Sequence, residues 1–424
     1  MSGAFVRRTV TGLALALLCA RPHTILAQTH PAHVPGVPAE ATEPQGFLSE
    51  PDLVQRAVIL ADRQFGNGEL TNGLYADLWN MIPGSGWISA GPGYRRWYAG
   101  DQVFLDTSAA ISWRAYKTAH ARIELPKIAR SRLALGSEVR WQDFTQVNFF
   151  GEGSDALKSN RSEYRLRSKN LVGYATFRPV EWLGIGGNIG WLDPSVLPRA
   201  GTFQADRPDT RDLLPGDIVF RLADQPTFLH SELSITADTR DFPGHPLRGG
   251  LVRAAAANYS DRDAGVFTFK RYEAEGAGFV PLVGSRMVIA SHGWLVTSDA
   301  DAGHFVPFYL QPSLGGQNTL RAFMDYRFHD RDMLVVNVEA RFAMMTHVDA
   351  AVLFDAGNVA ARVADLNLDK RSYGAGLRVH SRRQTFGRLD VARGSDGWRM
   401  LFWLSDPLNL ARLTRRTAQI PFVP

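Results

Sequence analysis

The chain has 424 residues, of which 45% are hydrophobic, with 47 basic and 42 acidic side chains. Three arginines, Arg7, Arg8 and Arg21, lie in a predicted export signal, and their removal leaves 44 basic residues against 42 acidic ones. This balance argues against a nucleic-acid-binding protein, which normally carries a concentrated basic face. The single cysteine, Cys19, lies in the same signal, which excludes disulfides, thiolate metal sites and a cysteine nucleophile from the mature chain.

Residues 1–27 are predicted to be a secretory signal peptide. Arg7 and Arg8 precede an apolar run at residues 9–20, and residues 25–27 offer a tolerable cleavage site. The alternative is a retained anchor, although the run is too short to span a bilayer as a helix. No later stretch approaches the ~20 apolar residues of a membrane helix. The chain after the signal peptide is therefore either a soluble protein or a membrane β-barrel, whose polar interior-facing residues keep its hydropathy low.

Residues 28–70 are predicted to form a flexible leader followed by one short helix. The leader is rich in proline, histidine, threonine and alanine. Ser49 is placed to cap the helix, and the sequence Gly66-Asn67-Gly68 ends it. Apolar side chains recur at helical spacing between these points, at Leu53, Ala57 and Leu60.

From residue 86 to residue 405 the hydrophobic pattern has a period of two, which is typical of β-strands. The clearest case is residues 334–342, where Asn337, Glu339 and Arg341 alternate with apolar side chains. The same alternation predicts a single long strand at residues 105–125. One face of each strand is thus charged and the other apolar.

The connections between the strands alternate in length, which distinguishes a membrane barrel from a soluble sandwich. Short turns are predicted near residues 127–130, 178–182, 242–248, 282–285, 345–346 and 381–383, and long loops near 148–161, 193–227, 299–331 and 358–370. We therefore predict an all-β fold, a transmembrane antiparallel β-barrel at residues 71–405. The charged parity then faces a wet lumen and the apolar parity faces lipid.

About fourteen strands can be drawn directly, and a further hairpin would bring the number to about sixteen, an even number as bacterial barrels require. That hairpin is sought at residues 70–82 or 213–222. Residues 406–424 form a C-terminal tail, either a short helix near the rim or disordered chain.

Several segments, taken in chain order, resemble the BamA/TamA superfamily of outer-membrane assembly barrels. Residues 313–323 (SLGGQNTLRAF) resemble the hallmark loop of that family, in which a glycine pair precedes an arginine and an aromatic residue. Downstream, Val338-Glu339-Ala340-Arg341 and Leu353-Phe354-Asp355-Ala356-Gly357 match the final strands in order and spacing. Upstream, residues 149–155 resemble an extracellular loop, and residues 238–250 resemble a periplasmic hairpin.

The resemblance implies an outer-membrane location and a role in assembly or translocation, with membrane lipid and unfolded outer-membrane proteins as partners, or a separate periplasmic protein. It also exposes two departures. Ala322 stands where the family usually has glycine, and residues 28–85 show no pattern of a POTRA module, so we expect a member of the barrel-only branch. Two alternatives to an assembly barrel stay open, a passive solute pore and a structural surface protein.

The candidate site is a pairing of Arg321 with Asp355, with Glu339 as a second acceptor. An arginine inside a lumen needs a partner because an unpaired charge there loses hydration, and both acids have lumen parity on consecutive strands. The family implies the same pairing, whereas the residues alone favour the alternative that Arg321 is one solvated loop arginine among many and that Asp355 lines the pore. The hallmark loop contributes Gly315, Gly316, Leu320, Ala322 and Phe323.

No catalytic constellation is found. The glycines at residues 184–190 have the wrong spacing for a nucleotide loop, and no helix follows them. His230 and Ser231 are adjacent and so face opposite sides of a strand, unlike a hydrolase pair. The run at residues 329–332 is read as solvated loop rather than a cation site. We predict a non-enzyme with no cofactor, no metal site and no nucleic-acid partner.

Overall fold

The computed structural model describes residues 46–61, 72–77, 89–201, 206–213, 225–283, 286–382 and 384–403. All of them belong to the unit formed by residues 43–424. The predicted signal peptide and the predicted tail at residues 406–424 lie outside the described residues, and so does the leader up to residue 45. In the part of the chain that the structure describes, no helix is both long and apolar enough to cross a bilayer.

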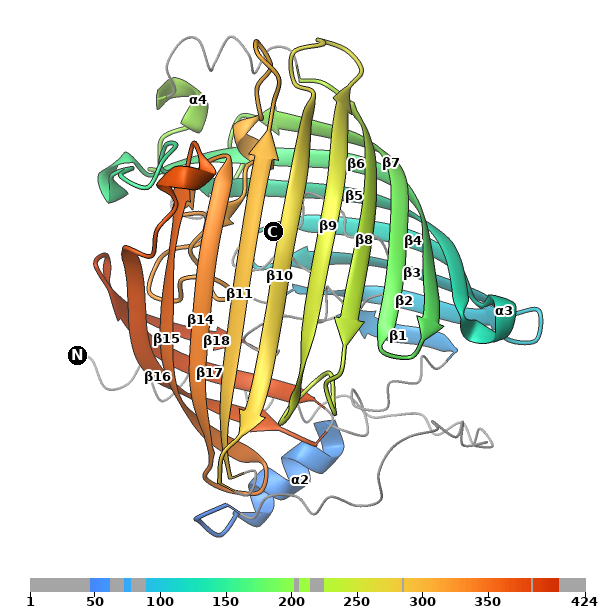
Figure 1. The fold of residues 1–424 in the computed structure, drawn as a ribbon, viewed down its shortest axis with the longest axis vertical. Coiled ribbons are helices and arrows are strands. Elements are labelled where there is room, and N and C mark those ends of the chain that lie inside the picture. The colour runs from blue at the N-terminus through green and yellow to red at the C-terminus, as the bar shows by residue number, and fades with distance from the viewer. Residues whose placement is uncertain are drawn as a thin grey trace. The chain divides into compact units, whose positions relative to one another are not determined.

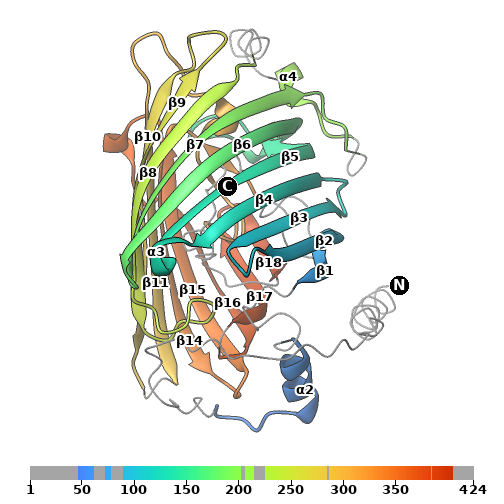
Figure 2. The same cartoon turned by 90° about the vertical axis from the view of Figure 1, so that its right-hand side faces the viewer.

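The main element is one antiparallel sheet of 16 strands, which curves round on itself (Figures 1 and 2). Its strands are β1 (Gly73–Asp77), β2 (Ser89–Tyr98), β3 (Val103–Ser112), β4 (Lys117–Lys127), β5 (Leu133–Phe149), β6 (Ser162–Val180), β7 (Leu183–Leu197), β8 (Phe228–Asp238), β9 (Gly249–Asp261), β10 (Phe269–Pro281), β11 (Met287–Asp299), β14 (Asp332–Ala343), β15 (Val348–Ala360), β16 (Lys370–His380), β17 (Thr385–Gly394) and β18 (Gly397–Trp403).

Strands pair in chain order, except that β11 pairs with β14. The two strands skipped, β12 (Ser313–Leu314) and β13 (Phe328–His329), pair with each other inside the connecting loop. The helices are short: α2 (Asp52–Ala61), α3 (Ile128–Ser131), α4 (Thr210–Leu213) and the 3-10 turns η2 (Lys158–Asn160), η3 (Phe308–Leu310) and η4 (Val363–Asp365). The prediction of a short helix after Ser49 is confirmed by α2.

The predicted number of strands is also confirmed. The missing hairpin begins at β1, which lies within the predicted range 70–82, whereas residues 214–222 of the second candidate range lie outside the described residues. The alternation of connections is confirmed as well. The four predicted long loops join strands at one end of the sheet, and the predicted short turns join them at the other.

One prediction is wrong: residues 105–125 do not form one long strand. They belong to β3 and β4, which are joined by a turn at residues 113–116 and closed by a hydrogen bond from the N–H of Ser112 to the carbonyl of Tyr116, at 2.8 Å. The turn has no glycine or proline, and Ala115 takes the positive φ of 59°. Because the turn has four residues, even-numbered residues face inward on both strands, so the pattern runs through it unbroken.

The charged parity faces the interior of the sheet and the apolar parity faces outward. Glu339 and Asp355 are fully buried, whereas Val352 and Phe354 on the opposite face of β15 are 58% and 43% exposed. In water such exposed apolar side chains are unfavourable, but toward lipid they are not. The sheet therefore has the inside-out polarity of a membrane barrel.

Candidate functional site

The candidate site is the loop that joins β11 to β14 and turns back onto the inner face of the sheet. Its two arms pair as β12 and β13, and the tip at residues 315–327 is closed by a hydrogen bond from the N–H of Gly316 to the carbonyl of Phe323, at 3.1 Å. Two consecutive glycines with positive φ, Gly315 at 115° and Gly316 at 96°, make the bend. These conformations are open to glycine because it has no Cβ.

The tip also needs glycine for space. A Cβ on Gly315 would lie 2.0 Å from the carbonyl oxygen of Met324, and one on Gly316 would lie 2.2 Å from a carboxylate oxygen of Asp325. Both distances are far below van der Waals contact. The glycine pair is thus required by the conformation of the loop as well as by its packing.

The bend delivers Arg321 to the inner face of β14 and β15. Its Nε donates to both carboxylate oxygens of Asp355 at 3.1 and 3.0 Å, its Nη1 donates to Glu339, and its backbone N–H donates to Asp355 at 3.1 Å. Arg321 is 1% exposed, and both acids are fully buried. The structure therefore brings the three sequence-predicted residues together in one buried, charge-assisted hydrogen-bond network.

Asp355 is saturated by neighbours from two further positions. The hydroxyl of Ser372 on β16 donates to it at 2.7 Å, and the side-chain amide of Asn337 on β14 donates at 2.8 Å. The same amide donates to the backbone carbonyl of Thr319 in the loop, at 2.6 Å. These bonds fix the position of the carboxylate that binds the guanidinium. They also satisfy its oxygens, and a buried polar network is stabilising only when its members are satisfied.

The network extends further along the wall than the sequence predicts. Arg378 on β16 donates to Glu339 at 3.0 Å and to Asp390 on β17 at 2.5 Å, and Arg341 donates to Glu339 at 3.0 Å. Arg388 on β17 donates to the backbone carbonyl of Gln317 in the loop, at 3.1 Å. The lumen parity of these arginines is visible in the sequence, but their convergence on the wall acids and on the loop depends on the register of four strands.

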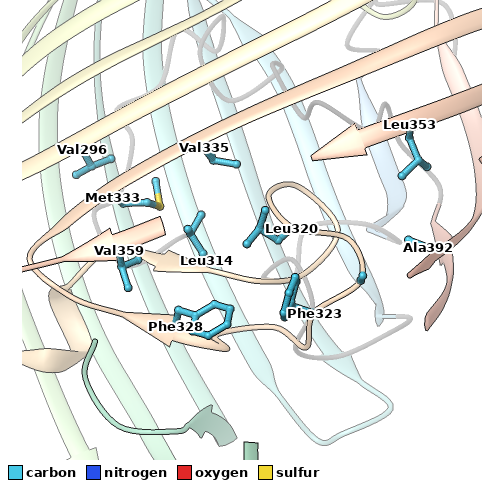
Figure 3. Close-up of a cluster of buried hydrophobic side chains, with 11 residues drawn as sticks. Val296, Leu314, Leu320, Phe323, Phe328, Met333, Val335, Leu353, Val359 and Ala392 are labelled. Atoms are coloured by element: carbon cyan, nitrogen blue, oxygen red, sulfur yellow. The ribbon is translucent and has the colours of Figure 1, made fainter. Parts of the chain in front are cut away.

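Apolar side chains anchor the same loop on its other side. Figure 3 shows Leu320 and Phe323 of the tip close to Leu314 and Phe328, the residues of the paired arms. The rings of Phe323 and Phe328 lie edge to face with centroids 5.3 Å apart. The cluster is completed by side chains of the surrounding strands: Val296, Met333, Val335, Leu353, Val359 and Ala392, with Ala322 of the tip. The hallmark residues Leu320, Ala322 and Phe323 are thus loop-packing residues.

The alanine at position 322 is accommodated without a strained backbone. Ala322 does not have a positive φ, and its methyl group packs toward Gly394 at the end of β17. A Cβ on Gly394 would lie 3.0 Å from the Cβ of Ala322, the carbonyl oxygen of Arg371 and a ring carbon of Phe323. The absence of a side chain at Gly394 leaves the room that Ala322 and Phe323 occupy.

Gly394→Ala is therefore expected to loosen the tip of the loop. Overpacking of this kind costs about 1–3 kcal/mol. Limited proteolysis of the folded barrel should show faster cleavage within residues 314–328, and adding Ala322→Gly should restore protection only in part because two other contacts remain. Gly173→Ala is the control, since a Cβ there meets nothing closer than 3.9 Å. Equal protection of both single variants would contradict this account of the packing.

Part of the chain that contains these features is similar to known proteins. Residues 209–392 match the Omp85 superfamily domain. This segment contains the loop with Arg321 and both of its carboxylate partners.

Two solved structures have a similar fold. BamA from Haemophilus ducreyi, in a form lacking POTRA domains 1–3, aligns with a TM-score of 0.59 and 15% identity over 78% of this chain and 69% of that one. CdiB from Escherichia coli aligns with a TM-score of 0.50 and 11% identity over 83% of this chain and 67% of that one. A search of curated protein sequences finds no significant match.

The match of residues 209–392 agrees with the polarity of the sheet and with the resemblance found in the sequence. The protein is an outer-membrane β-barrel, and residues 209–392 of it match the Omp85 superfamily domain. Its lipid-facing and lumen-facing residues are those on the two parities described above.

Proposed function

We propose that this Omp85 barrel acts without enzymatic chemistry in the assembly or translocation of polypeptides at the outer membrane. Its substrates are unfolded outer-membrane proteins or other extended chains, delivered directly or by a periplasmic partner. The observation that carries the proposal is the pair of short strands, β1 and β18, at the two ends of the sheet.

These two strands are the shortest of the sheet as described, with 5 residues in β1 and 7 in β18. Each pairs along one side only, β1 with β2 and β18 with β17, and among the described residues no backbone pairing joins β1 to β18. An unpaired strand edge presents N–H and C=O groups that an incoming strand can pair with. A seam of this kind supports lateral entry of a substrate strand into the wall.

The anchored loop acts on one side of this seam. Arg399 of β18 donates to the backbone carbonyl of Phe323 and, at 2.9 Å, to the carboxylate of Asp325. The tip that Arg321 fastens to β14 and β15 is therefore also bonded to the last strand. We propose that the Arg321 network fixes the loop so that the loop in turn sets the position of β18.

The test is a disulfide lock across the seam. Cys19 is replaced, paired cysteines are scanned along β1 and β18, and each pair is used to complement a strain that lacks the protein. The matched control joins β17 to β18 through Val391→Cys and Met400→Cys, which already face each other in the sheet. Quantitative proteomics of outer-membrane and surface-exposed proteins is the readout, with and without a reductant.

We expect the deletion to lower a defined set of outer-membrane or surface polypeptides by several-fold. The control pair should restore them, and a seam-locked pair should restore them only in the presence of the reductant. An unchanged proteome together with a large single-channel conductance would instead favour the passive pore. An unchanged proteome without conductance would favour a structural surface protein.

A further inference from the structure

A hollow lies on the lipid-facing surface of the wall, away from the Arg321 network. It is formed by the neighbouring strands β6, β7, β8, β9 and β10, which lie side by side (Figure 1). Its larger lining side chains have outward parity: Ile189, Leu233 and Tyr272 are 58%, 72% and 47% exposed. The hollow has a volume of about 680 Å³. Sites that bind small molecules usually have a volume of about 300–1,000 Å³, so the hollow is large enough for a ligand.

The hollow exists because its floor is made of small residues. The glycines and alanines of the floor with outward parity are Gly173, Ala175, Gly187 and Ala256. In the register of the sheet, Gly187 lies opposite Leu233, and Ala256 lies between Leu233 and Tyr272. A small residue between bulky neighbours leaves a recess, and glycine within a strand often marks a place where a ligand comes close to the backbone. The recess is apolar and suits a hydrocarbon chain.

At the end of the hollow that is nearer the long loops, three polar side chains form a row across the wall. Ser231 of β8 pairs with Asn258 of β9, and Asn258 pairs with Lys270 of β10. All three line the hollow and have outward parity, like Leu233 and Tyr272 on the same strands. None of the three side chains makes a hydrogen bond or an ion pair with any residue that the structure describes.

This row offers hydrogen-bond donors and a positive charge, the groups that bind a phosphate. A hydroxyl, an amide and an ammonium group can all donate, and polar groups that face lipid are costly without a partner. The carboxylate of Glu232, whose residue also lines the hollow, binds Arg253 at 2.6 Å and is not directed to the row. Asp299 lies opposite Lys270 on β11 but makes no ion pair with it. The ammonium of Lys270 is therefore available to an anion.

The row lies at the depth of the lipid headgroups on the extracellular side. Strands β8, β9 and β10 have 11, 13 and 13 residues, at or above the about 9–11 residues that cross the hydrocarbon core. Each residue of the row lies within three positions of the end of its strand that carries the long loops, which are extracellular in such barrels. Ala256 of the floor lies two residues further from the loops than Asn258, a step of about 6.6 Å along the strand.

We propose that this hollow binds a phosphate-bearing lipid of the outer leaflet. The phosphate binds Ser231, Asn258 and Lys270, and an acyl chain lies in the recess over Ala256. The order of polar and apolar groups along the wall is that of a lipid in this leaflet, with the charged end toward the loops. A second copy of the chain fits less well, because its own apolar outward face would bury the ammonium of Lys270 without a partner.

The test uses the purified full-length barrel in detergent. It is titrated with didodecanoyl phosphatidic acid and, separately, with didodecanoylglycerol, which has the same chains without the phosphate. Native mass spectrometry counts the lipids retained on each chain and reports the oligomeric state. We expect one retained phosphatidic acid, bound more tightly than the diacylglycerol and not displaced by inorganic phosphate. The site is independent of the proposed function, because it shares no residue with the Arg321 network or the β1–β18 seam.

Removing the charge tests the headgroup end of the site. Lys270→Gln should weaken the binding of phosphatidic acid about fivefold, the effect of one lysine near an anionic headgroup, and leave the binding of diacylglycerol unchanged. The matched control is Lys169→Gln, since Lys169 also has outward parity but its ammonium lies 3.8 Å from the carboxylate of Asp193. The control should bind both lipids as the unchanged protein does.

Filling the recess tests the acyl end. Ala256→Leu should weaken the binding of both lipids about tenfold, because the added side chain occupies the floor of the hollow. Ala254→Leu is the control, since it adds the same bulk on the same face of β9 at a residue that does not line the hollow. Heat-modifiable migration on gels verifies that each variant is a folded barrel.

Four results would overturn the proposal. The first is that the folded unchanged protein retains no phosphatidic acid, and the second is that either variant binds as its control does. The third is displacement of the lipid by inorganic phosphate, which would indicate a site for the free anion. The fourth is a dimer that Ala256→Leu dissociates, which would show that a second copy of the chain covers the hollow.

Discussion

Arg321→Ala is expected to destabilise the barrel by about 3–5 kcal/mol, because it leaves Asp355 and Glu339 buried with part of their compensating charge removed. Asp355→Ala should lower the stability by a similar amount, since it removes the main partner of the buried guanidinium. The double variant should be little worse than either single one. Such non-additivity is the sign of a direct interaction in a double-mutant cycle.

The measurement is denaturant unfolding of the purified barrel, with proteolysis at residues 314–328 as a local readout and single-channel conductance as a functional one. The same cycle at Arg362 and Asp365 is the control. That pair has the same chemistry, with a hydrogen bond at 2.8 Å, but its side chains are 75% and 49% exposed. Exposed pairs contribute about 0–1 kcal/mol. Strictly additive losses at Arg321 and Asp355 would show that the pairing does not stabilise the protein.

The second large effect is expected for Gly315→Ala. The new Cβ meets the carbonyl oxygen of Met324 at 2.0 Å, and the residue is held at a φ of 115°. Backbone strain of this kind costs roughly 1–3 kcal/mol, and steric overpacking adds about 1–3 kcal/mol. The loop should leave its place on the wall, with a rise in conductance and rapid proteolysis of the tip.

Gly153→Ala separates the two causes. Gly153 also has a positive φ, of 90°, but a Cβ there meets no atom within 4 Å, so only the strain applies. The loss of stability should therefore be smaller than for Gly315→Ala by the part due to the clash. Equal losses in the two variants would mean that close packing at the loop tip contributes nothing.

Much of the fold could be predicted because the two faces of a barrel wall lie against different surroundings, water on the inside and lipid on the outside. Strand β14 shows why: each lumen-facing polar residue is followed by an apolar one that faces lipid, so the alternation is legible without any relatives. The turn at residues 113–116 could not be predicted, because its four residues keep the parity and Ala115 replaces the expected glycine. The odd or even position of a residue predicts which face of the sheet its side chain lies on, but not where the chain turns back.

The site shows the same division. The acids on β14 and β15 could be selected by parity and by the resemblance, and the structure places Arg321 between them, while its role in function stays a prediction. The contributions of Arg388 and Asp390 were missed because they depend on how far β17 is displaced along β16. The contact of His245 with His380 was not predicted for a related reason, since the meeting of the β8–β9 turn with the end of β16 is not encoded in any local pattern.

The loop tip also constrains the order in which the protein folds. Its bonds to Asp355, Arg388 and Arg399 lead to residues that follow it in the chain, by 34, 71 and 74 positions respectively. A chain is synthesised from its N-terminus onward, so the loop tip is made before any of these partners. The tip can bind to the wall only after the C-terminal strands have formed. Docking of the loop therefore depends on long-range contacts, which are slow to form, and a chain truncated before β17 would leave Arg321 without its complete surroundings.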